Sequence, residues 1–124
     1  MFVHWWHPST RGWELSWPLV GGTAALPRCQ DVPAAAYHAN APTFVPRRRS
    51  ATEWMALARR AGMRYAVFTA KHHDGFALWD TQASDFSVAR GPYGGDLVRE
   101  YVDAARAEGL HVGLYLSLSD WHHP

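Results

Sequence analysis

The chain has 124 residues, a net charge of +1 with histidine neutral, and 48% hydrophobic residues. This length supports one ordinary domain, yet it is half of the about 250 residues that a closed eight-stranded barrel needs. The near-zero charge gives no electrostatic reason to expect a nucleic-acid partner, and no apolar run is long enough to span a membrane. Cys29 is the single cysteine, which excludes an internal disulfide and a thiolate-rich zinc site, and we interpret it as an incidental thiol.

The first predicted element is a buried strand over residues 1–5, with the sequence MFVHW. From His7 to Pro46 the chain is rich in proline, glycine, alanine and tryptophan, and it follows neither the helical nor the strand period. A connection of this length within a compact domain is usually functional or disordered. Its aromatic content favours a functional segment, because tryptophan and tyrosine pair an apolar face with a polar edge.

A helix is expected to begin at Ser50. Glu53 follows at the spacing of a capping box, in which the two side chains satisfy each other's free backbone N–H groups. Gly62 is placed to end the helix in the left-handed conformation. One face of this helix is predicted to carry the apolar residues Trp54, Leu57, Ala58 and Ala61.

The pattern then alternates between strand and helix. Residues 65–70 form an apolar run without alternation, which is typical of a parallel strand buried on both faces. Asp96 can cap a second helix, which ends at Gly109, and residues 112–116 form the next buried strand. The apolar face of this second helix is expected to hold Leu97, Tyr101, Val102 and Ala105.

These elements predict an α/β fold with parallel strands. An open doubly wound sheet would carry a glycine-rich nucleotide-binding turn after its first strand, and none follows Val3 or Ala70. The strands are followed by histidine, tryptophan and aspartate, which is typical of barrel enzymes with active sites at the carboxyl ends of the strands. The predicted fold is therefore a partial (β/α)8 TIM-type barrel, with roughly the first three strands and two helices.

Three predicted strand ends carry polar and aromatic side chains. They are His4 to His7, Lys71 to Gly75, and Tyr115 with the residues that follow it up to His123. His72 and His73 would point to opposite faces of a continuing strand, so both can enter one pocket only if the backbone bends, which Gly75 makes plausible. An alternative hypothesis is a metal-dependent barrel hydrolase with His72, His73, Asp74 and His4 as ligands.

The residues at these strand ends resemble the α-L-fucosidases of glycoside hydrolase family 29. The longest matching motif is KHHDGFALWDT at residues 71–81, and the opening strand MFVHW also fits. Three further segments match in order: SDF at 84–86, GPY at 91–93 with DLV at 96–98, and GLYLSLSDW at 113–121. The resemblance covers nearly the whole chain.

The resemblance implies the amino-terminal part of a glycoside hydrolase catalytic barrel over residues 1–124, in a family whose barrel is followed by a β-sandwich. It implies hydrolysis of terminal α-L-fucosides with retention, on a fucosylated glycan or glycoside, with no cofactor and no metal. It further implies five substrate-binding residues whose side chains hydrogen-bond the sugar hydroxyls: His4, Glu14, His72, His73 and Tyr115. Such fixed polar groups select a small deoxy sugar, because a wrong sugar leaves them unpaired.

The family's nucleophile and acid/base lie after later strands, so the resemblance implies no catalytic carboxylate within this chain and no turnover by it alone. Asp74, Asp80, Asp85 and Asp120 are instead expected to be turn or cap acceptors. Three unclosed strands would expose edges and apolar faces, which predicts self-association unless something covers them. A non-enzymatic sugar-binding fragment is the third hypothesis.

Two positions depart from the family pattern. Trp6 stands where glycine is common, which predicts a crowded pocket entrance. Leu15 follows Glu14 where an aromatic residue is common, and Trp13 and Trp17 are the residues expected to supply that aromatic surface.

Overall fold

The computed structural model describes residues 1–21 and 31–123, so Cys29 lies outside the described residues. Its regular elements are β1 (Phe2–Val3), α1 (Ala34–His38), α2 (Ser50–Arg60), β2 (Tyr65–Lys71), α3 (Leu97–Ala107) and β3 (His111–Leu116), with short 3-10 helices at His7–Thr10, Trp17–Val20 and Ala41–Thr43. Within the two described ranges, no helix is long and apolar enough to cross a membrane.

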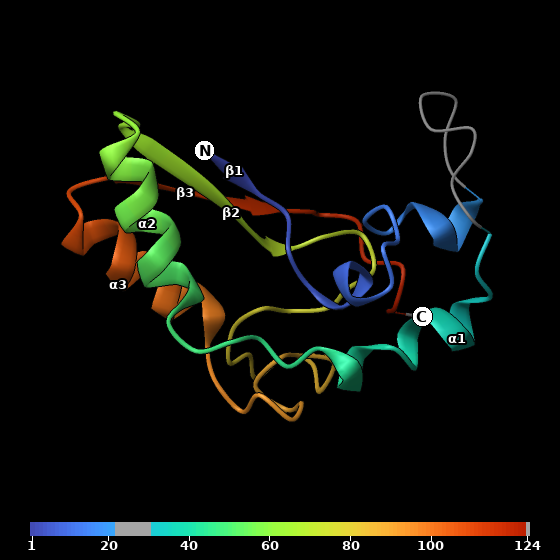
Figure 1. Cartoon of the computed structure of the whole chain (residues 1–124). Coiled ribbons are helices and arrows are strands. Elements are labelled where there is room, and N and C mark those ends of the chain that lie inside the picture. The colour runs from blue at the N-terminus through green and yellow to red at the C-terminus, as the bar shows by residue number, and fades with distance from the viewer. Residues whose placement is uncertain (22–30, 124) are drawn as a thin grey trace.

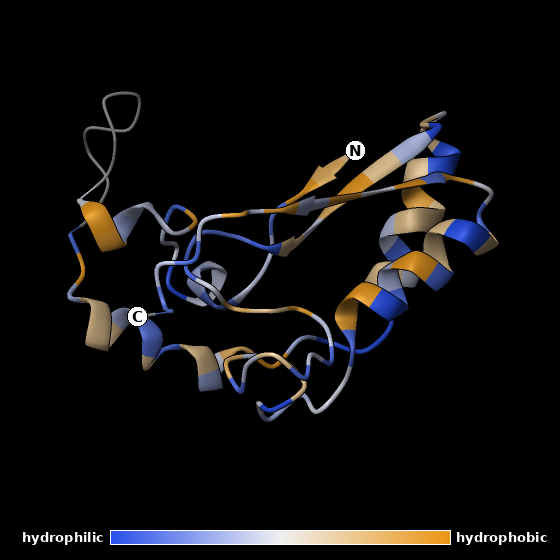
Figure 2. Ribbon diagram, turned by 180° about the vertical axis from the view of Figure 1, so that it is seen from behind, coloured by the Kyte–Doolittle hydropathy of each residue, from blue (hydrophilic) through white to orange (hydrophobic). Residues whose placement is uncertain are grey.

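The three strands form one parallel sheet in the order β1-β2-β3, which confirms the predicted α/β arrangement. The helices α2 and α3 pack together beneath the sheet, and the carboxyl ends of the strands point toward the irregular segments (Figure 1). Figure 2 shows hydrophobic residues along each of the strands. The strand β2 is largely buried, whereas β1 and β3 are partly exposed, so the prediction that these two strands are buried is wrong.

The strand β1 is shorter than the predicted segment 1–5. The Met1 amino group donates to the carbonyl of Tyr65, and the Val67 amide donates to the carbonyl of Met1 over 2.7 Å, so pairing with β2 begins at the first residue. Beyond Val3 the chain turns away, and the Trp5 ring packs against Trp54 with ring centroids 4.7 Å apart.

The second predicted helix is confirmed with both of its ends. Asp96 caps α3 by accepting a hydrogen bond of 2.7 Å from the Arg99 amide, and Gly109 follows with a positive φ of 68°. The buried Tyr101 hydroxyl donates to the carbonyl of Ala66 in β2 over 2.6 Å, which fixes the helix against the sheet. Of the predicted apolar face, Val102 is only half-buried, and Ala104 takes its place in the core.

The predicted capping box at the start of α2 is wrong. Ser50 is the first helical residue, and its hydroxyl donates to the carbonyl of Arg47 over 2.7 Å. Glu53 forms an ion pair with Arg47 instead of reaching back to a backbone N–H. The reason is that Arg49, the residue before the helix, adopts a left-handed φ of 70°, which leaves the Ser50 side chain outside the capping position.

The buried face of α2 also differs from the prediction. Met55 and Ala58 are buried, whereas Leu57 and Ala61 are exposed and Trp54 is half-buried. The contact between the Trp54 and Trp5 rings sets the rotation of the helix, which turns Met55 into the core and Leu57 outward.

Candidate functional site

The structure brings His4, His72, His73 and Tyr115 together at the carboxyl edge of the sheet. The ring centroids of His4 and His72 are 5.7 Å apart, those of His72 and Tyr115 are 5.6 Å apart, and those of His72 and His73 are 4.4 Å apart. These side chains come from the ends of all the strands of the sheet. Four of the five residues predicted to bind substrate therefore form one cluster, which we call the histidine cluster.

The strand register explains why His4 and Tyr115 meet. Thr69 in β2 pairs with Tyr115 in β3, and Val3 pairs with Phe68, so His4 falls in the same row as Thr69 and Tyr115. Residues in one row across a parallel sheet share a face. The Thr69 hydroxyl lies 2.5 Å from His4 Nδ1, which holds that imidazole against the sheet.

The predicted backbone bend at the histidine pair is present, but it begins earlier than expected. The register between β2 and β3 shifts between Thr69 and Lys71, which is the mark of a β-bulge just before His72. Gly75 then takes a positive φ of 81° in the turn that follows. Because a bulge re-aims the side chains beyond it, both histidines reach the same cluster.

Two buried serines bind the histidine pair. Ser117 is among the polar residues predicted at the strand ends, whereas Ser16 is not predicted, and neither pairing with histidine is. Ser16 Oγ lies 2.7 Å from His72 Nδ1, and Ser117 Oγ lies 2.5 Å from His73 Nδ1. Ser117 belongs to a matched motif at the end of β3, whereas Ser16 lies in the irregular segment and carries no local signal of its partner.

Aromatic residues flank the pair on one side. The Trp17 ring lies 5.7 Å from His72 and 5.2 Å from His73, and Trp121 lies 4.8 Å from His73. Of the two tryptophans predicted to provide an aromatic surface, Trp17 does so. Trp13 instead stacks on Tyr37 at 5.4 Å and does not face the histidine pair.

Glu14 is exposed, and its carboxylate acts on the cluster through its charge. Burial lowers the pKa of His4, and the Glu14 carboxylate partly opposes this shift. Across the described residues, the Glu14 side chain makes no hydrogen bond to the cluster.

Asp74 is the fully buried carboxylate beneath the histidine cluster. Its Oδ2 accepts hydrogen bonds from Trp6 Nε1 over 2.6 Å and from the Tyr37 hydroxyl over 2.8 Å, and its Oδ1 accepts from the Phe76 amide over 3.2 Å. His7 Nε2 lies 3.4 Å from the same Oδ2. Burial alone would raise the pKa of Asp74, but His7, Trp6 and Tyr37 outweigh it, so this pKa is lowered.

Trp6 does not crowd a pocket entrance, contrary to the prediction. It is 2% exposed, with its N–H committed to Asp74 and its ring 5.3 Å from His72. The bulky residue therefore lies under the cluster, because the buried carboxylate needs a donor there.

Of the other aspartates predicted to be turn or cap acceptors, only one accepts hydrogen bonds of that kind in the described residues. Asp120 accepts from the backbone N–H groups of His122 and His123, as a turn acceptor should, and it also binds Lys71 over 2.9 Å. Asp80 instead donates its backbone N–H to Asp96, and the exposed Asp85 lies 3.8 Å from Arg90 in an ion pair.

The metal hypothesis finds no geometric support. In residues 1–21 and 31–123, no group of three or more His, Cys, Asp or Glu side chains could hold a metal ion. Asp74, one of the ligands in that hypothesis, is fully buried and committed to its own donors.

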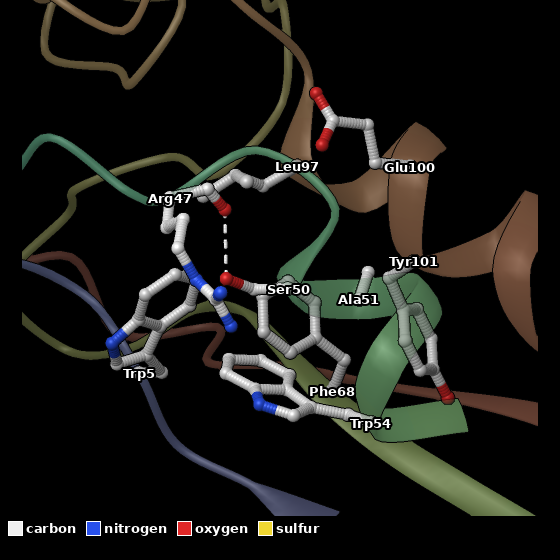
Figure 3. Close-up of a pocket in the computed structure, with 9 residues that line it drawn as sticks. All are labelled: Trp5, Arg47, Ser50, Ala51, Trp54, Phe68, Leu97, Glu100 and Tyr101. Atoms are coloured by element: carbon white, nitrogen blue, oxygen red, sulfur yellow. Dashed lines mark hydrogen bonds between the residues drawn. The ribbon is translucent and has the colours of Figure 1, made fainter. Parts of the chain in front are cut away.

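A separate small pocket lies on the helix-covered face. Its volume is about 10 Å³. Figure 3 shows Trp5, Trp54, Phe68 and Tyr101 among the residues that line it, beside the hydrogen bond from Ser50 to the carbonyl of Arg47. That volume suits a single water molecule at most. None of the residues of the histidine cluster lines this pocket, so it is a packing gap and not the candidate site.

The pKa of His72 offers a direct test of this geometry. Two causes lower that pKa to about 4: burial of the ring is the larger, and the nearby His73 is the next. An unfolded histidine binds its proton near pH 6.5, so the free energy of unfolding should fall as the pH drops from about 6.5 toward about 4. We expect an NMR titration to give His72 a pKa of about 4. A midpoint near 6.5 would contradict the buried position.

Replacing Asp74 tests the buried network. Asp74→Asn removes the charge and turns one acceptor into a donor, so it should lower the free energy of unfolding by about 2 to 3 kcal/mol. Asp85→Asn is the matched control, since that side chain is exposed, and it should change stability by less than about 0.5 kcal/mol. Urea unfolding measures both, and equal effects would show that Asp74 does not hold the segments together.

The comparisons with known proteins agree with this arrangement. The family model described as alpha-L-fucosidase matches residues 1–124. The tissue alpha-L-fucosidase of Rattus norvegicus is 34% identical over 133 aligned residues, which cover 100% of this chain and 29% of the relative. The chain thus spans less than a third of the length of that relative.

Solved structures of alpha-L-fucosidases also match this chain. Alpha-L-fucosidase isoenzyme 1 from Paenibacillus thiaminolyticus is 48% identical, with a TM-score of 0.70 over 74% of this chain and 22% of that one. An alpha-L-fucosidase from Bacteroides thetaiotaomicron, solved as a trapped covalent intermediate with 2-fluoro-fucosyl fluoride, is 30% identical, with a TM-score of 0.81 over 99% of this chain and 28% of that one. The chain therefore belongs to the α-L-fucosidase family, glycoside hydrolase family 29.

Proposed function

We propose that the chain forms the amino-terminal part of a (β/α)8 catalytic barrel and supplies a fucose-binding half-site to a retaining α-L-fucosidase. The observation that carries the proposal is the histidine cluster, in which side chains from the ends of three parallel strands meet at one edge. In barrel enzymes this edge is where substrates bind.

The exposed sheet supports the barrel part of the proposal. On β3, Leu114 and Leu116 are 50% and 51% exposed, which is unusual for apolar residues of a parallel strand. Further strands and helices of a barrel would cover them. In the isolated chain the same surface favours self-association, which remains a prediction.

The chemistry of the cluster suits a small sugar. The imidazoles and the Tyr115 hydroxyl offer donors and acceptors in fixed positions, and the low pKa of His72 keeps that ring neutral near pH 7. Trp17 and Trp121 add apolar ring faces, on which the methyl group and the apolar face of fucose can pack. Glu14 adds an exposed carboxylate that can accept from a hydroxyl, consistent with the role that the family resemblance gives it.

Retention requires a carboxylate nucleophile and a second carboxyl group about 5 Å away as acid/base. Asp74 is enclosed by its donors, and Asp120 is bound to Lys71, so neither suits attack on an anomeric carbon. We therefore assign binding and orientation of the fucosyl group to these 124 residues, and both reacting carboxylates to segments outside them. The proposed mechanism uses no metal and no cofactor.

Calorimetric titration of the chain with L-fucose tests the proposal. We expect L-fucose to bind and D-galactose not to bind, because the cluster is complementary to the deoxy sugar. His72→Ala should weaken binding by about tenfold for each hydrogen bond lost. His111→Ala is the matched control, since His111 lies at the opposite end of β3 and is exposed.

Two results would overturn the proposal. One is equal binding of both sugars, and the other is equal weakening by the two histidine variants. Hydrolysis of an aryl α-L-fucoside by the chain alone would contradict the assignment of the reacting carboxylates to other segments.

A further inference from the structure

His72 and His73 are each held through the same ring atom by a buried serine. Ser16 comes from the irregular segment before α1, and Ser117 follows β3 directly. The Nε2 atoms of both rings make no hydrogen bond within residues 1–21 and 31–123. Each imidazole is therefore anchored at Nδ1 and has Nε2 left for a ligand.

The proton of the Ser117 hydroxyl has an identified acceptor. Ser117 Oγ donates to the carbonyl of Ser119 over 2.9 Å, and a hydroxyl has one proton to give. Ser117 can then only accept from His73, over the 2.5 Å that separate Oγ from Nδ1. His73 must carry its proton on Nδ1, which leaves Nε2 unprotonated in the neutral ring.

In the hydrogen bond between Ser16 and His72, the serine is the donor. Its Oγ accepts from the Asp74 amide over 3.1 Å, and its shortest hydrogen bond, of 2.7 Å, joins it to His72 Nδ1. The Tyr37 hydroxyl is a second neighbour of Ser16, but its oxygen is already bound to Asp74. A buried hydroxyl proton is costly when it has no acceptor. Donation from Ser16 to Nδ1 satisfies that proton and places the proton of His72 on Nε2.

We propose that Ser16 and Ser117 are positioning residues that fix His72 and His73 in opposite tautomers, so that the pair presents one N–H donor and one nitrogen acceptor to neighbouring sugar hydroxyls. The inference rests on the proposed function for its ligand, but the tautomers themselves exist without sugar. Two rings with centroids 4.4 Å apart and opposite polarity match adjacent hydroxyls, one accepting and the other donating.

Opposite tautomers give the two rings different roles toward a ligand. One sugar hydroxyl donates to Nε2 of His73, and a neighbouring hydroxyl accepts from the Nε2–H of His72. A ligand that lacks the donating hydroxyl leaves the acceptor of His73 unpaired, which costs affinity.

Two-bond ¹H–¹⁵N correlation spectra of the chain labelled with ¹⁵N-histidine, recorded near pH 7 without sugar, show which ring nitrogen carries each proton. We expect Nε2–H for His72 and Nδ1–H for His73. The same tautomer for both rings would overturn the proposal. Opposite tautomers in a chain that does not bind L-fucose would support the serine assignment and remove the proposed function, so the two failures are distinguishable.

Serine variants test the cause. Ser117→Ala should move His73 toward the Nε2–H form, and Ser117→Thr should restore the original spectrum because it keeps the hydroxyl. Ser119→Ala is the matched control, since it retains the accepting carbonyl. Ser16→Ala should move His72 toward the Nδ1–H form, whereas the exposed Ser9→Ala should not.

L-fucose affinity provides the second readout. We expect Ser16→Ala and Ser117→Ala each to weaken binding by about tenfold, with Ser119→Ala and Ser9→Ala unchanged. Unchanged tautomers in both of the buried serine variants, with folding confirmed by the dispersion of the spectrum, would show that these serines do not position the rings.

Discussion

The buried charge of Asp74 is the constraint on which the site depends. A carboxylate removed from water is stable only when donors surround it, and here the donors come from segments far apart in the sequence: Trp6 after β1, and Tyr37 at α1. The Asp74 amide in turn binds Ser16, which contacts His72. Asp74 thus joins the irregular segment to the turn that carries the histidine pair, and it fixes that segment beside the candidate site.

The parallel sheet supplies the second constraint. The register between β2 and β3 sets Tyr115 beside Thr69, and the bulge before His72 redirects the chain into the cluster. The helices occupy the other face, where Tyr101 fixes α3 to the sheet through the carbonyl of Ala66. The helices therefore support the sheet from one face, and the polar side chains of the candidate site lie at the carboxyl ends of its strands.

Sequence patterns predicted the features whose causes are local. The apolar runs of β2 and β3, the Asp96 cap and the turn at Gly109 each follow from a few neighbouring residues. The strand-end positions of His72 and Tyr115 placed them in one cluster because parallel strands end at one edge. The predicted bounds of α2 are also close to the observed ones. The predicted buried face of that helix is wrong, because a contact with Trp5 sets the rotation of the helix.

The remaining features depend on contacts that no short pattern encodes. Ser16 meets His72 across 56 residues and Trp6 meets Asp74 across 68, within a segment that follows no helical or strand period. The failed capping box has a local cause, since Arg49 adopts a left-handed conformation that the residue pattern does not predict. Burial of polar groups is decided by the assembled fold, so these partners could be found only from the structure.

Chemical-shift mapping of L-fucose binding tests the central claim most directly. Titration of the ¹³C- and ¹⁵N-labelled chain should shift the ring signals of His4, His72, His73 and Tyr115 most strongly, with the Trp5 and Trp54 signals on the helix-covered face unchanged. Shifts concentrated at Trp5 and Trp54, or no shifts at saturating sugar in a folded chain, would contradict a fucose half-site at the carboxyl edge of the sheet.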